Sequence, residues 1–273
     1  MSKRDGEGRT ALVTGASAGI GTAFAHEFAR HGFDLVLVAR REGRLQALAE
    51  DLRQDHGVNA TVLPADLSDR DTPERLWQQI SERNLTVDAL VNNAGFGVPG
   101  DFRHQVWQKH ADFLQVMVTS VVHLTHLAEP AMVQRGYGRI LNVASLAGLI
   151  PPTGGHTLYG AAKRFVIDFS EALAQEHRGD GLHVTAVCPG FTYSEFHDVL
   201  GNRSDVQALP SIIWMDADSV ARLGYAACNE GRSVAVTGRV NRAIAALFSI
   251  LPGSMGQALM KRPARKFRVR SGD

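Results

Sequence analysis

Short apolar runs alternate with amphipathic segments along most of this 273-residue chain. The runs are rich in Val, Leu, Ile and Ala and have no polar face, which is typical of parallel strands covered on both sides. They lie at Ala11–Thr14, Leu35–Ala39, Thr61–Leu63, Ala89–Asn92, Ile140–Val143, His183–Cys188 and Ser233–Thr237. This alternation predicts an α/β fold, in which right-handed crossovers build a doubly wound parallel sheet with helices on both faces.

The segments between the runs have the periodicity of helices. Ile20, Phe24 and Phe28 recur at every fourth position, which predicts a helix after the first strand. A long helix is expected within Val106–Arg135, and another is expected to begin near Tyr159. The chain has no internal repeat and no low-complexity linker, so we expect one domain over residues 1–273.

A glycine-rich turn follows the first apolar run. Glycine allows backbone conformations closed to other residues and a close approach of backbone to pyrophosphate, and the following helix offers free amide groups to phosphates. The residues expected to bind a dinucleotide here are Gly15, Ser17, Ala18, Gly19, Ile20 and Gly21. A purely structural tight turn is the alternative, which the position between a strand and an amphipathic helix disfavours.

Two arginines, Arg40 and Arg41, follow the second apolar run. In a dinucleotide fold this junction meets the adenosine ribose, where arginine pairs with a 2′-phosphate and an acidic residue with a free hydroxyl. The absence of an acid here predicts NADP(H) as the cofactor; the alternative is a solvated arginine pair. Asp66 follows the third run and is expected near the adenine, with a turn or helix-cap role equally open.

Tyr159 and Lys163 stand four residues apart, which places both on one face of a helix. A phenol ionises near pH 10 in water, and a nearby ammonium group favours the phenolate, so we expect Lys163 to lower the pKa of Tyr159. Ser145 follows the fifth apolar run and can hold a substrate oxygen. These three residues beside a dinucleotide predict hydride transfer to or from a carbonyl. A hydrolase role for Ser145 is disfavoured, because it lacks a glycine-flanked nucleophile turn.

The motifs together resemble the short-chain dehydrogenase/reductase superfamily over roughly Arg9 to Gly238. They stand in the family's order: Thr14-Gly-x-x-x-Gly19-Ile20-Gly21, Asp66, Asn92-Asn93-Ala94-Gly95, Ser145, Tyr159-x-x-x-Lys163 and Pro189-Gly190-Phe191-Thr192. The resemblance implies one Rossmann-like domain with about seven strands that binds NAD(P) and interconverts alcohols and carbonyls. Arg40-Arg41 and the segment Leu124–His126 look most like ketoacyl-type reductases, by analogy only.

The resemblance also implies the roles of individual residues. Tyr159 would be the general acid/base, Lys163 would also bind the nicotinamide ribose, and Ser145 would orient the substrate oxygen. Further cofactor contacts are implied at Asp66, Leu67, Asn93, Ala94, Gly95, Pro189, Gly190 and Thr192. One departure is Met117, where the family often has an asparagine that supports a proton relay; a thioether cannot donate a proton. An NADP-binding sensor or assembly protein with little turnover is therefore the alternative function.

Residues 191–214 lack clear periodicity, which favours a flap over the substrate. The apolar residues expected to line it are Phe191, Tyr193, Phe196, Val199, Leu200, Ile212, Ile213 and Trp214. They predict an apolar substrate, such as a 3-ketoacyl chain, a steroid-like compound or an aromatic ketone. Residues 243–273 are expected to form a C-terminal extension that begins with the apolar stretch Ala243–Leu251 and ends in a basic tail.

Net charge and cysteine content restrict the possible partners and the cellular compartment of the protein. A net charge of +1 indicates no nucleic-acid partner, and two cysteines without a signal peptide favour a reduced cytoplasmic protein. We expect no membrane-spanning segment, although the basic tail could contact an anionic membrane surface or remain solvated. His123, His126 and Glu129 lie close together, but three or four convergent ligands are not evident, so no metal site is predicted. A homodimer or homotetramer is implied by the resemblance.

Overall fold

The computed structural model describes residues 4–152, 154–155, 157–193, 195 and 210–264. These residues build a seven-stranded, all-parallel sheet with the strand order β3-β2-β1-β4-β5-β6-β9. Its strands are β1 (Thr10–Thr14), β2 (Asp34–Ala39), β3 (Ala60–Pro64), β4 (Ala89–Asn92), β5 (Gly138–Val143), β6 (Leu182–Cys188) and β9 (Val234–Val236). Each expected strand is present within two residues of its predicted bounds, so the predicted fold class is confirmed.

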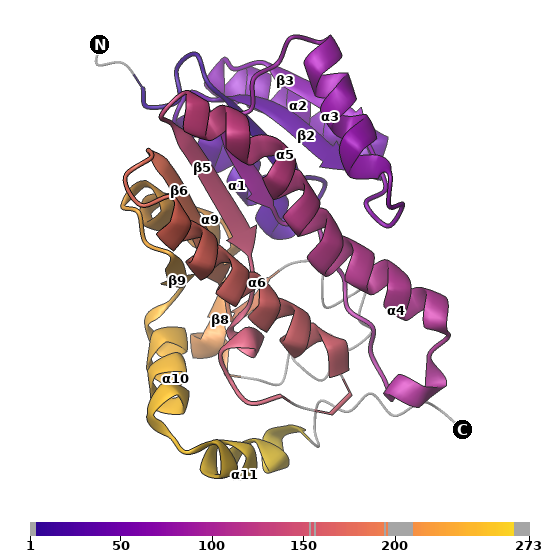
Figure 1. Ribbon diagram of the computed structural model, residues 1–273, viewed down its shortest axis with the longest axis vertical. Coiled ribbons are helices and arrows are strands. Elements are labelled where there is room, and N and C mark those ends of the chain that lie inside the picture. The colour runs from indigo at the N-terminus through magenta and orange to yellow at the C-terminus, as the bar shows by residue number, and fades with distance from the viewer. Residues whose placement is uncertain (1–3, 153, 156, 194, 196–209, 265–273) are drawn as a thin grey trace.

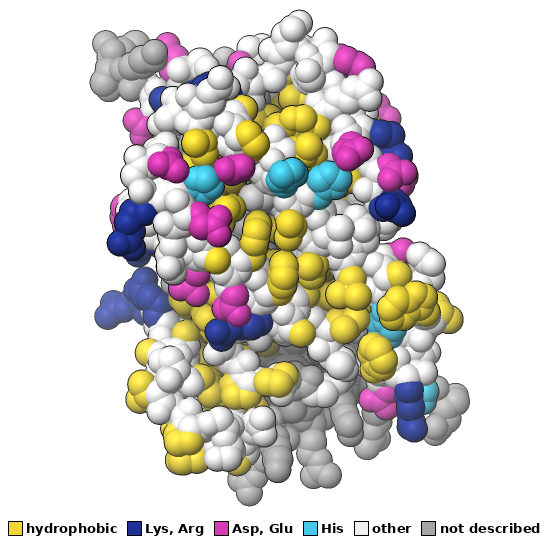
Figure 2. Space-filling view, in the orientation of Figure 1, with side chains coloured by type: hydrophobic (Ala, Val, Ile, Leu, Met, Phe, Trp, Pro, Cys, Tyr) yellow, Lys and Arg dark blue, Asp and Glu magenta, His cyan; other side chains and the backbone are white. Residues whose placement is uncertain are grey.

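Helices cover both faces of the sheet (Figure 1). One face carries α1 (Gly19–Arg30), α2 (Glu42–His56) and α9 (Ala217–Asn229). The other carries α3 (Thr72–Glu82), α5 (Ser120–Gln134) and α6 (Thr157–Glu176), with α4 (Trp107–Leu114) running on from α5. Figure 2 shows this second face, on which apolar side chains gather over the region of α4, α5 and α6.

The core consists of the aliphatic strand residues and the inner faces of these helices. Phe24 and Phe28 of α1 are fully buried against β1 and β2, as their spacing predicted, and Leu124 and Met132 of α5 pack on the opposite face. Burial of apolar surface on both sides, at roughly 25 cal/mol per Å², is the main favourable contribution to folding. Because both faces are covered, each strand is apolar without alternation.

The long helix expected within Val106–Arg135 is continuous but not uniform. A π-helical turn, η2 (Gln115–Thr119), joins α4 to α5. Such turns concentrate at functional sites, because the extra residue re-aims the side chains around it. The combined helix Trp107–Gln134 is long and apolar enough to span a membrane by length and composition, which the sequence analysis did not anticipate. Its buried face packs on the sheet, and the core helix of a soluble protein passes the same test.

The direction in which the chain adds strands reverses between β1 and β4: β2 and β3 lie on one side of β1, and β4, β5, β6 and β9 follow on the other side. In open α/β sheets such a switch point opens a crevice at the carboxyl ends of the strands. Thr14, Asn92, Val143 and Cys188 end their strands at this same edge. The fold therefore brings all the predicted motifs to one side of the molecule.

The C-terminal part adds a small second sheet and two helices. The short strand β7 (Phe191–Thr192) pairs with β8 (Trp214–Met215), just after the 3₁₀ turn η4 (Ser211–Ile213). The two ends of the expected flap are thus held together, while its interior residues Phe196, Val199 and Leu200 lie outside the described residues. Next follow α10 (Arg239–Ile250) and α11 (Gly253–Ala264).

The C-terminal extension expected over residues 243–273 holds most of α10 and all of α11, and α10 begins four residues before Ala243. Gly238, with φ of +86°, turns the chain directly from β9 into α10, so the helix begins at Arg239. Sequence analysis missed this first turn because its polar residues break the apolar run. The basic tail beyond residue 264 lies outside the described residues.

Candidate active site

The turn between β1 and α1 forms a narrow backbone cradle. Gly15 and Gly19 have φ angles of +65° and +56°, in the left-handed region that favours glycine. A Cβ atom on Gly21 would collide with the carbonyl oxygen of Gly15. Each of the three glycines is therefore required by the local geometry, and the open N-terminus of α1 faces the crevice as a phosphate site requires. These residues fit a dinucleotide.

The cradle is braced by the loop after β4. The Thr14 hydroxyl accepts hydrogen bonds from the amides of Asn93 and Ala94 at 2.9 and 3.1 Å and donates to the Val91 carbonyl at 3.1 Å. The Asn93 side chain donates to the Thr14 carbonyl at 3.0 Å. Asn93 and Ala94 thus lie beside the cradle, and the Asn93 side-chain amide helps to hold it. Gly95 follows against Met117.

The arginines after β2 lie at the rim of the crevice. Arg41 donates to the Ser17 hydroxyl at 3.0 Å and pairs with Glu195 at 2.8 Å, while Arg44 pairs with the other Glu195 oxygen at 2.6 Å. These charge-assisted bonds lower the pKa of Glu195, so it is a carboxylate at neutral pH. Two guanidinium groups therefore already hold an anion where the sequence predicted a 2′-phosphate.

Glu195 and Arg44 were not identified from the sequence. Arg44 lies in the first turn of α2, three residues after Arg41, which precedes the helix as its N-cap, a spacing that brings the two side chains close. Glu195 carries no comparable signal, because it is more than 150 residues away in the chain. Only the folded chain brings it to the arginines.

Asp66 and Leu67 follow β3, on the far side of the same rim. Asp66 accepts hydrogen bonds from the amide and hydroxyl of Ser68, which makes a turn, and stands 3.9 Å from Arg40. The turn role that the sequence left open is therefore present. The Leu67 side chain is buried in the core, and its carbonyl accepts a hydrogen bond from Ser120 at 3.0 Å.

Ser145, Tyr159 and Lys163 converge beyond the carboxyl end of β5. Ser145 begins the 3₁₀ turn η3 (Leu146–Gly148), and its hydroxyl accepts a hydrogen bond from the Ala147 amide. Buried Gly148 lets this turn approach the backbone of α6, since a Cβ there would lie 2.8 Å from Lys163 and Arg164 backbone atoms. The approach brings Ser145 into hydrogen-bond contact with Tyr159.

The electrostatics of this group differ from the prediction. Burial raises the pKa of Tyr159 to about 12, and the Ser145 hydrogen bond opposes the rise only in part. The Tyr159 side chain keeps some exposed surface, but its phenol oxygen is enclosed by protein. Lys163 is not among the groups that lower the pKa of Tyr159 here; its ammonium donates to the Val143 carbonyl at 2.6 Å and lies 5.7 Å from the centre of the Tyr159 ring. Helical spacing placed the residues on one face but did not decide where the long lysine side chain would point.

The buried ammonium group of Lys163 is predicted to make stability depend on pH. Burial lowers the pKa of Lys163 from 10.5 to about 8. Between these values the unfolded chain binds a proton that the folded protein does not, so the free energy of unfolding contributed by this group rises with pH. The free energy of unfolding of the wild type relative to Lys163→Met should therefore increase from about pH 8 to about pH 10, measured by urea denaturation of both proteins. A constant or falling difference would contradict the lowered pKa.

Met117 lies in the π-helical turn and belongs to an apolar cluster beneath Tyr159. It is buried against Phe113 and Ala162, and a Cβ on Gly95 would lie 2.8 Å from its sulfur. An amide side chain in this cluster would need a buried hydrogen-bond partner. Packing between the long helix and α6 therefore explains why methionine fits at this position. Met117 does not disturb the contact between Ser145 and Tyr159.

The chain after β6 closes the crevice. The Pro189 carbonyl accepts a hydrogen bond from the Leu146 amide at 2.9 Å, which ties this segment to the Ser145 turn. A Cβ on Gly190 would collide with the buried side chain of Asn241, which donates to the Thr237 carbonyl at 2.8 Å. Asn241 of α10 thus packs against the segment that contains Gly190. No sequence motif indicates this role of Asn241. Thr192 is buried and donates to the Gly190 carbonyl at 3.2 Å.

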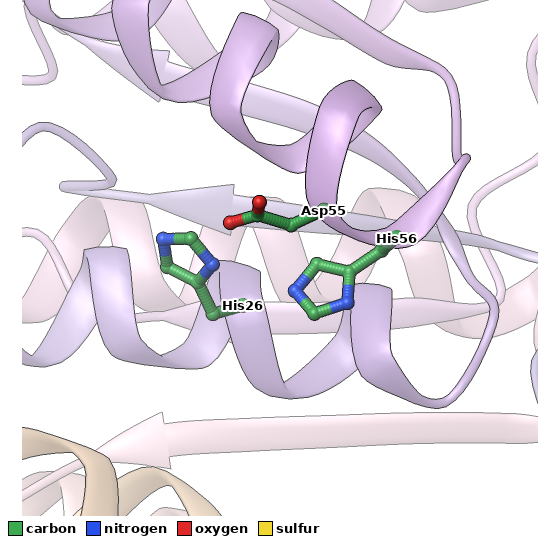
Figure 3. A group of neighbouring side chains, drawn as sticks. All are labelled: His26, Asp55 and His56. Atoms are coloured by element: carbon green, nitrogen blue, oxygen red, sulfur yellow. The ribbon is translucent and has the colours of Figure 1, made fainter.

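Three potential metal ligands converge elsewhere: His26 of α1, with Asp55 and His56 at the end of α2 (Figure 3). Their ligand atoms lie within 4.8 Å of one another, an arrangement the sequence analysis did not find because the helices are separate in the chain. Burial, His26 and the guanidinium groups of Arg30 and Arg4 lower the pKa of His56, and those same charges oppose a cation. The cluster lies on the opposite face of the sheet from α6 and takes no part in the crevice.

Comparison with known proteins is consistent with this geometry. The sequence profile of a family described as short chain dehydrogenase matches residues 9–204. Sulfoacetaldehyde reductase 2 from Chromohalobacter salexigens is 37% identical over 190 residues, which cover 68% of this chain and 73% of that protein. The 3-oxoacyl-[acyl-carrier-protein] reductase FabG from Haemophilus influenzae is 33% identical over 208 residues, 76% of this chain and 83% of that protein.

Solved structures are similar over a larger part of the chain. A short-chain dehydrogenase from Sphingobium yanoikuyae, solved in complex with NADPH, superimposes with a TM-score of 0.77 at 33% identity. The match covers 89% of this chain and 96% of that chain. The likeness to this solved structure therefore covers most of the chain.

Proposed function

Because the chain belongs to the short-chain dehydrogenase/reductase family, we propose that it is an NADPH-dependent reductase of apolar carbonyl compounds. The observation that carries this proposal is the hydrogen-bonded pair of Ser145 and Tyr159 beside Lys163, at the same sheet edge as the glycine cradle. The coarser conclusion, an oxidoreductase of this family, follows from the comparisons alone. The catalytic roles, the cofactor preference and the substrate class are the proposal.

The residues at the end of β5 would act on the carbonyl oxygen. Bound nicotinamide would supply the hydride to the carbonyl carbon. Ser145 would hold the oxygen by a hydrogen bond, and Tyr159 would donate its phenol proton to the oxygen as negative charge develops there. Lys163, anchored on the Val143 carbonyl, keeps a positive charge next to this reaction. Gly15, Gly19 and Gly21 would hold the pyrophosphate, with Pro189, Gly190 and Thr192 at the nicotinamide end.

The raised pKa of Tyr159 fits the role of proton donor in carbonyl reduction. At neutral pH a group with a pKa of about 12 carries its proton and is ready to donate it. An alkoxide is a stronger base than a phenolate, so the transfer from Tyr159 runs downhill once hydride has added. Alcohol oxidation instead begins with a phenolate, which burial disfavours in this protein.

The surroundings of Tyr159 support an apolar substrate. Val98, Phe102, Phe113 and Leu158 line a small pocket beside it, together with the polar residues His110 and Thr157. The rings of Phe191 and Tyr193 pack against the Trp214 ring, with centre-to-centre distances of 5.5 and 4.7 Å. These three rings add an aromatic wall at the base of the expected flap. We therefore propose ketones with an acyl chain, a steroid-like body or an aromatic ring as substrates; FabG, named as a 3-oxoacyl reductase, is among the relatives.

Cofactor preference gives a testable prediction at the arginine rim. We expect Arg41→Gln to weaken NADPH binding roughly tenfold and to leave NADH binding unchanged, because a charge-assisted bond to the 2′-phosphate is lost. Glu195→Gln should have the opposite effect on NADPH, since it removes the carboxylate that now holds Arg41 and Arg44. Both dissociation constants are measured by fluorescence titration of each nucleotide.

A matched control lies on α2, the helix that begins directly after Arg41. Glu50 pairs with Arg53 on α2, so Glu50→Gln also frees an arginine but away from the rim. It should leave both dissociation constants unchanged. Tighter binding of NADH than NADPH by the wild type, or equal changes for both nucleotides in the Glu195 variant, would overturn the assignment of NADPH.

A cofactor-binding sensor with little turnover remains the second candidate, favoured by Met117 at the position where the family often has a relay asparagine. The two functions differ in one measurement, the consumption of NADPH followed by absorbance with a panel of ketones and 3-ketoacyl thioesters. Consumption by the wild type selects the reductase. Binding of NADPH without consumption across the panel selects the sensor.

We also propose that the protein forms homo-oligomers through the face that carries α4, α5 and α6. Trp107 of α4 and Phe165 of α6 are exposed there, and Figure 2 shows apolar side chains gathered on this face. Exposed apolar patches of this kind mark interaction sites on otherwise polar surfaces. A cytoplasmic location remains part of the proposal.

A further inference from the structure

The C-terminal part of the sequence, residues 239–273, carries a net charge that the rest of the chain does not share. Residues 239–273 hold eight of the 29 lysines and arginines but only one of the 28 acids, Asp273. The preceding 238 residues are therefore net −6, although the whole chain is +1. Such asymmetry between parts of a chain indicates a surface with its own partner.

The same helices expose large apolar side chains. Leu247 and Ile250 on α10 are 45% and 79% exposed, and Met255 and Leu259 on α11 are 57% and 54% exposed. In each helix the two residues stand three or four positions apart and so lie on one face. Arg239 and Arg242 are exposed one to two turns earlier on α10.

The other side of this unit is attached to the protein body. Asn241 of α10 is buried beneath Gly190, and a Cβ on Gly256 of α11 would lie 3.0 Å from the Pro151 ring. Figure 1 shows α10 and α11 meeting at a corner at one end of the molecule, with α11 along its edge. The exposed apolar residues are therefore presented outward by two anchored helices.

We propose that α10 and α11 form a membrane-docking surface, made of Leu247, Ile250, Met255 and Leu259, that binds anionic phospholipid. Aliphatic side chains inserted between acyl chains, next to lysines and arginines at the headgroups, are the features of peripheral membrane helices. In the sequence, the last turn of α11 and the residues after it, 261–270, hold six lysines and arginines and no acid. Two copies of this unit would repel each other through their like charge, and a nucleic acid would leave the four aliphatic side chains in water.

The docking surface lies close to the expected substrate entrance. The turn η4, which contains exposed Ile212, contacts α10. Membrane binding would thus bring the base of the flap to the lipid, where apolar carbonyl compounds concentrate. This consequence rests on the proposed function, whereas membrane docking itself does not.

Cosedimentation of the full chain with lipid vesicles tests the proposal. We expect binding to phosphatidylcholine vesicles that contain phosphatidylserine, little binding to phosphatidylcholine alone, and release at high salt, because counterions screen the attraction. The double variant Leu247→Asp, Ile250→Asp should bind roughly tenfold more weakly, since two inserted side chains are replaced by anions. Both positions are exposed, so the fold tolerates the change, and circular dichroism verifies it.

Two further variants separate the contributions. Glutamine at Arg265, Lys266, Arg268 and Arg270 should weaken binding to the anionic vesicles without affecting the fold. Val106→Asp is the matched control, because Val106 is 64% exposed at the start of α4 and lies outside the docking surface; its binding should equal that of the wild type.

Other outcomes would overturn membrane docking. They are the absence of binding to anionic vesicles, binding that the double aspartate variant leaves unchanged, binding to nucleic acid in preference to vesicles, and a wild-type oligomer that the double variant dissociates. The last two would identify the surface as a polyanion site or a subunit interface. Each is independent of turnover, so failure here leaves the proposed reductase function untouched.

Discussion

Replacing Tyr159 with phenylalanine is expected to lower kcat for carbonyl reduction by roughly 10²- to 10⁴-fold, the usual contribution of a positioned general acid. The substitution removes one hydroxyl, the only group of this side chain that can donate a proton. The ring that packs near Met117 and Leu158 remains, so the fold and the glycine cradle should be preserved. The dissociation constant for NADPH should therefore change little, and both quantities follow from NADPH absorbance and fluorescence.

A second tyrosine provides the matched control. Burial also raises the pKa of Tyr225 to about 12, but this residue lies on α9, on the face of the sheet opposite to α6. Tyr225→Phe should retain turnover. Equal turnover in wild type and Tyr159→Phe would remove the reductase mechanism, and equal losses in both tyrosine variants would show that the effect is structural rather than chemical.

Adding a single methyl group at Gly21 is the second change with a large expected effect. The Cβ of alanine at this position would collide with the Gly15 carbonyl, so the turn or α1 must shift. We expect Gly21→Ala to lower the free energy of unfolding by roughly 1–3 kcal/mol, the range typical of an overpacked site. Because the displaced backbone belongs to the cradle, NADPH binding should weaken as well.

The control for this prediction is another glycine in the first turn of a helix. A Cβ on Gly43 of α2 meets nothing within 4 Å. Gly43→Ala should leave NADPH binding unchanged and raise the free energy of unfolding by up to about 1 kcal/mol, because alanine restricts the unfolded chain and favours the helix. Urea denaturation and fluorescence titration compare the two variants. If Gly21→Ala matches Gly43→Ala in both, the close approach at the cradle is absent in solution.

Much of the fold could be predicted because it depends on local patterns. Runs such as Leu35–Ala39 are apolar throughout, since strands in a parallel sheet are buried on both faces, and Phe24 and Phe28 mark the inner side of α1 by spacing alone. The cradle glycines could be predicted for the same reason, because a turn that needs positive φ restricts its residues locally. Where a boundary depends on one residue, as at Gly238, the hydrophobic pattern does not locate the start of the helix.

For the candidate site, the sequence indicated which residues could belong to it but not how their side chains are arranged. The sequence placed Tyr159 and Lys163 on one helix face, but the direction of the lysine depends on the Val143 carbonyl, which belongs to a different element. The expected lowering of the Tyr159 pKa was therefore wrong for this structure, in which enclosure of the phenol prevails. A pKa reports the three-dimensional surroundings of a group, and sequence spacing constrains only a small part of them.

The sequence by itself determined the sheet, the glycine cradle and which side chains are candidates for the reaction, because hydrophobic period and backbone conformation are properties of neighbouring residues. Only the tertiary structure decided which distant groups meet: Glu195 with Arg41 and Arg44, Asn241 beneath Gly190, and Met117 against Gly95. These contacts form between segments separated by tens to hundreds of residues, whose meeting depends on the packing of the whole sheet. Their charges and shapes then set the protonation states and the ligand preferences that no local pattern contains.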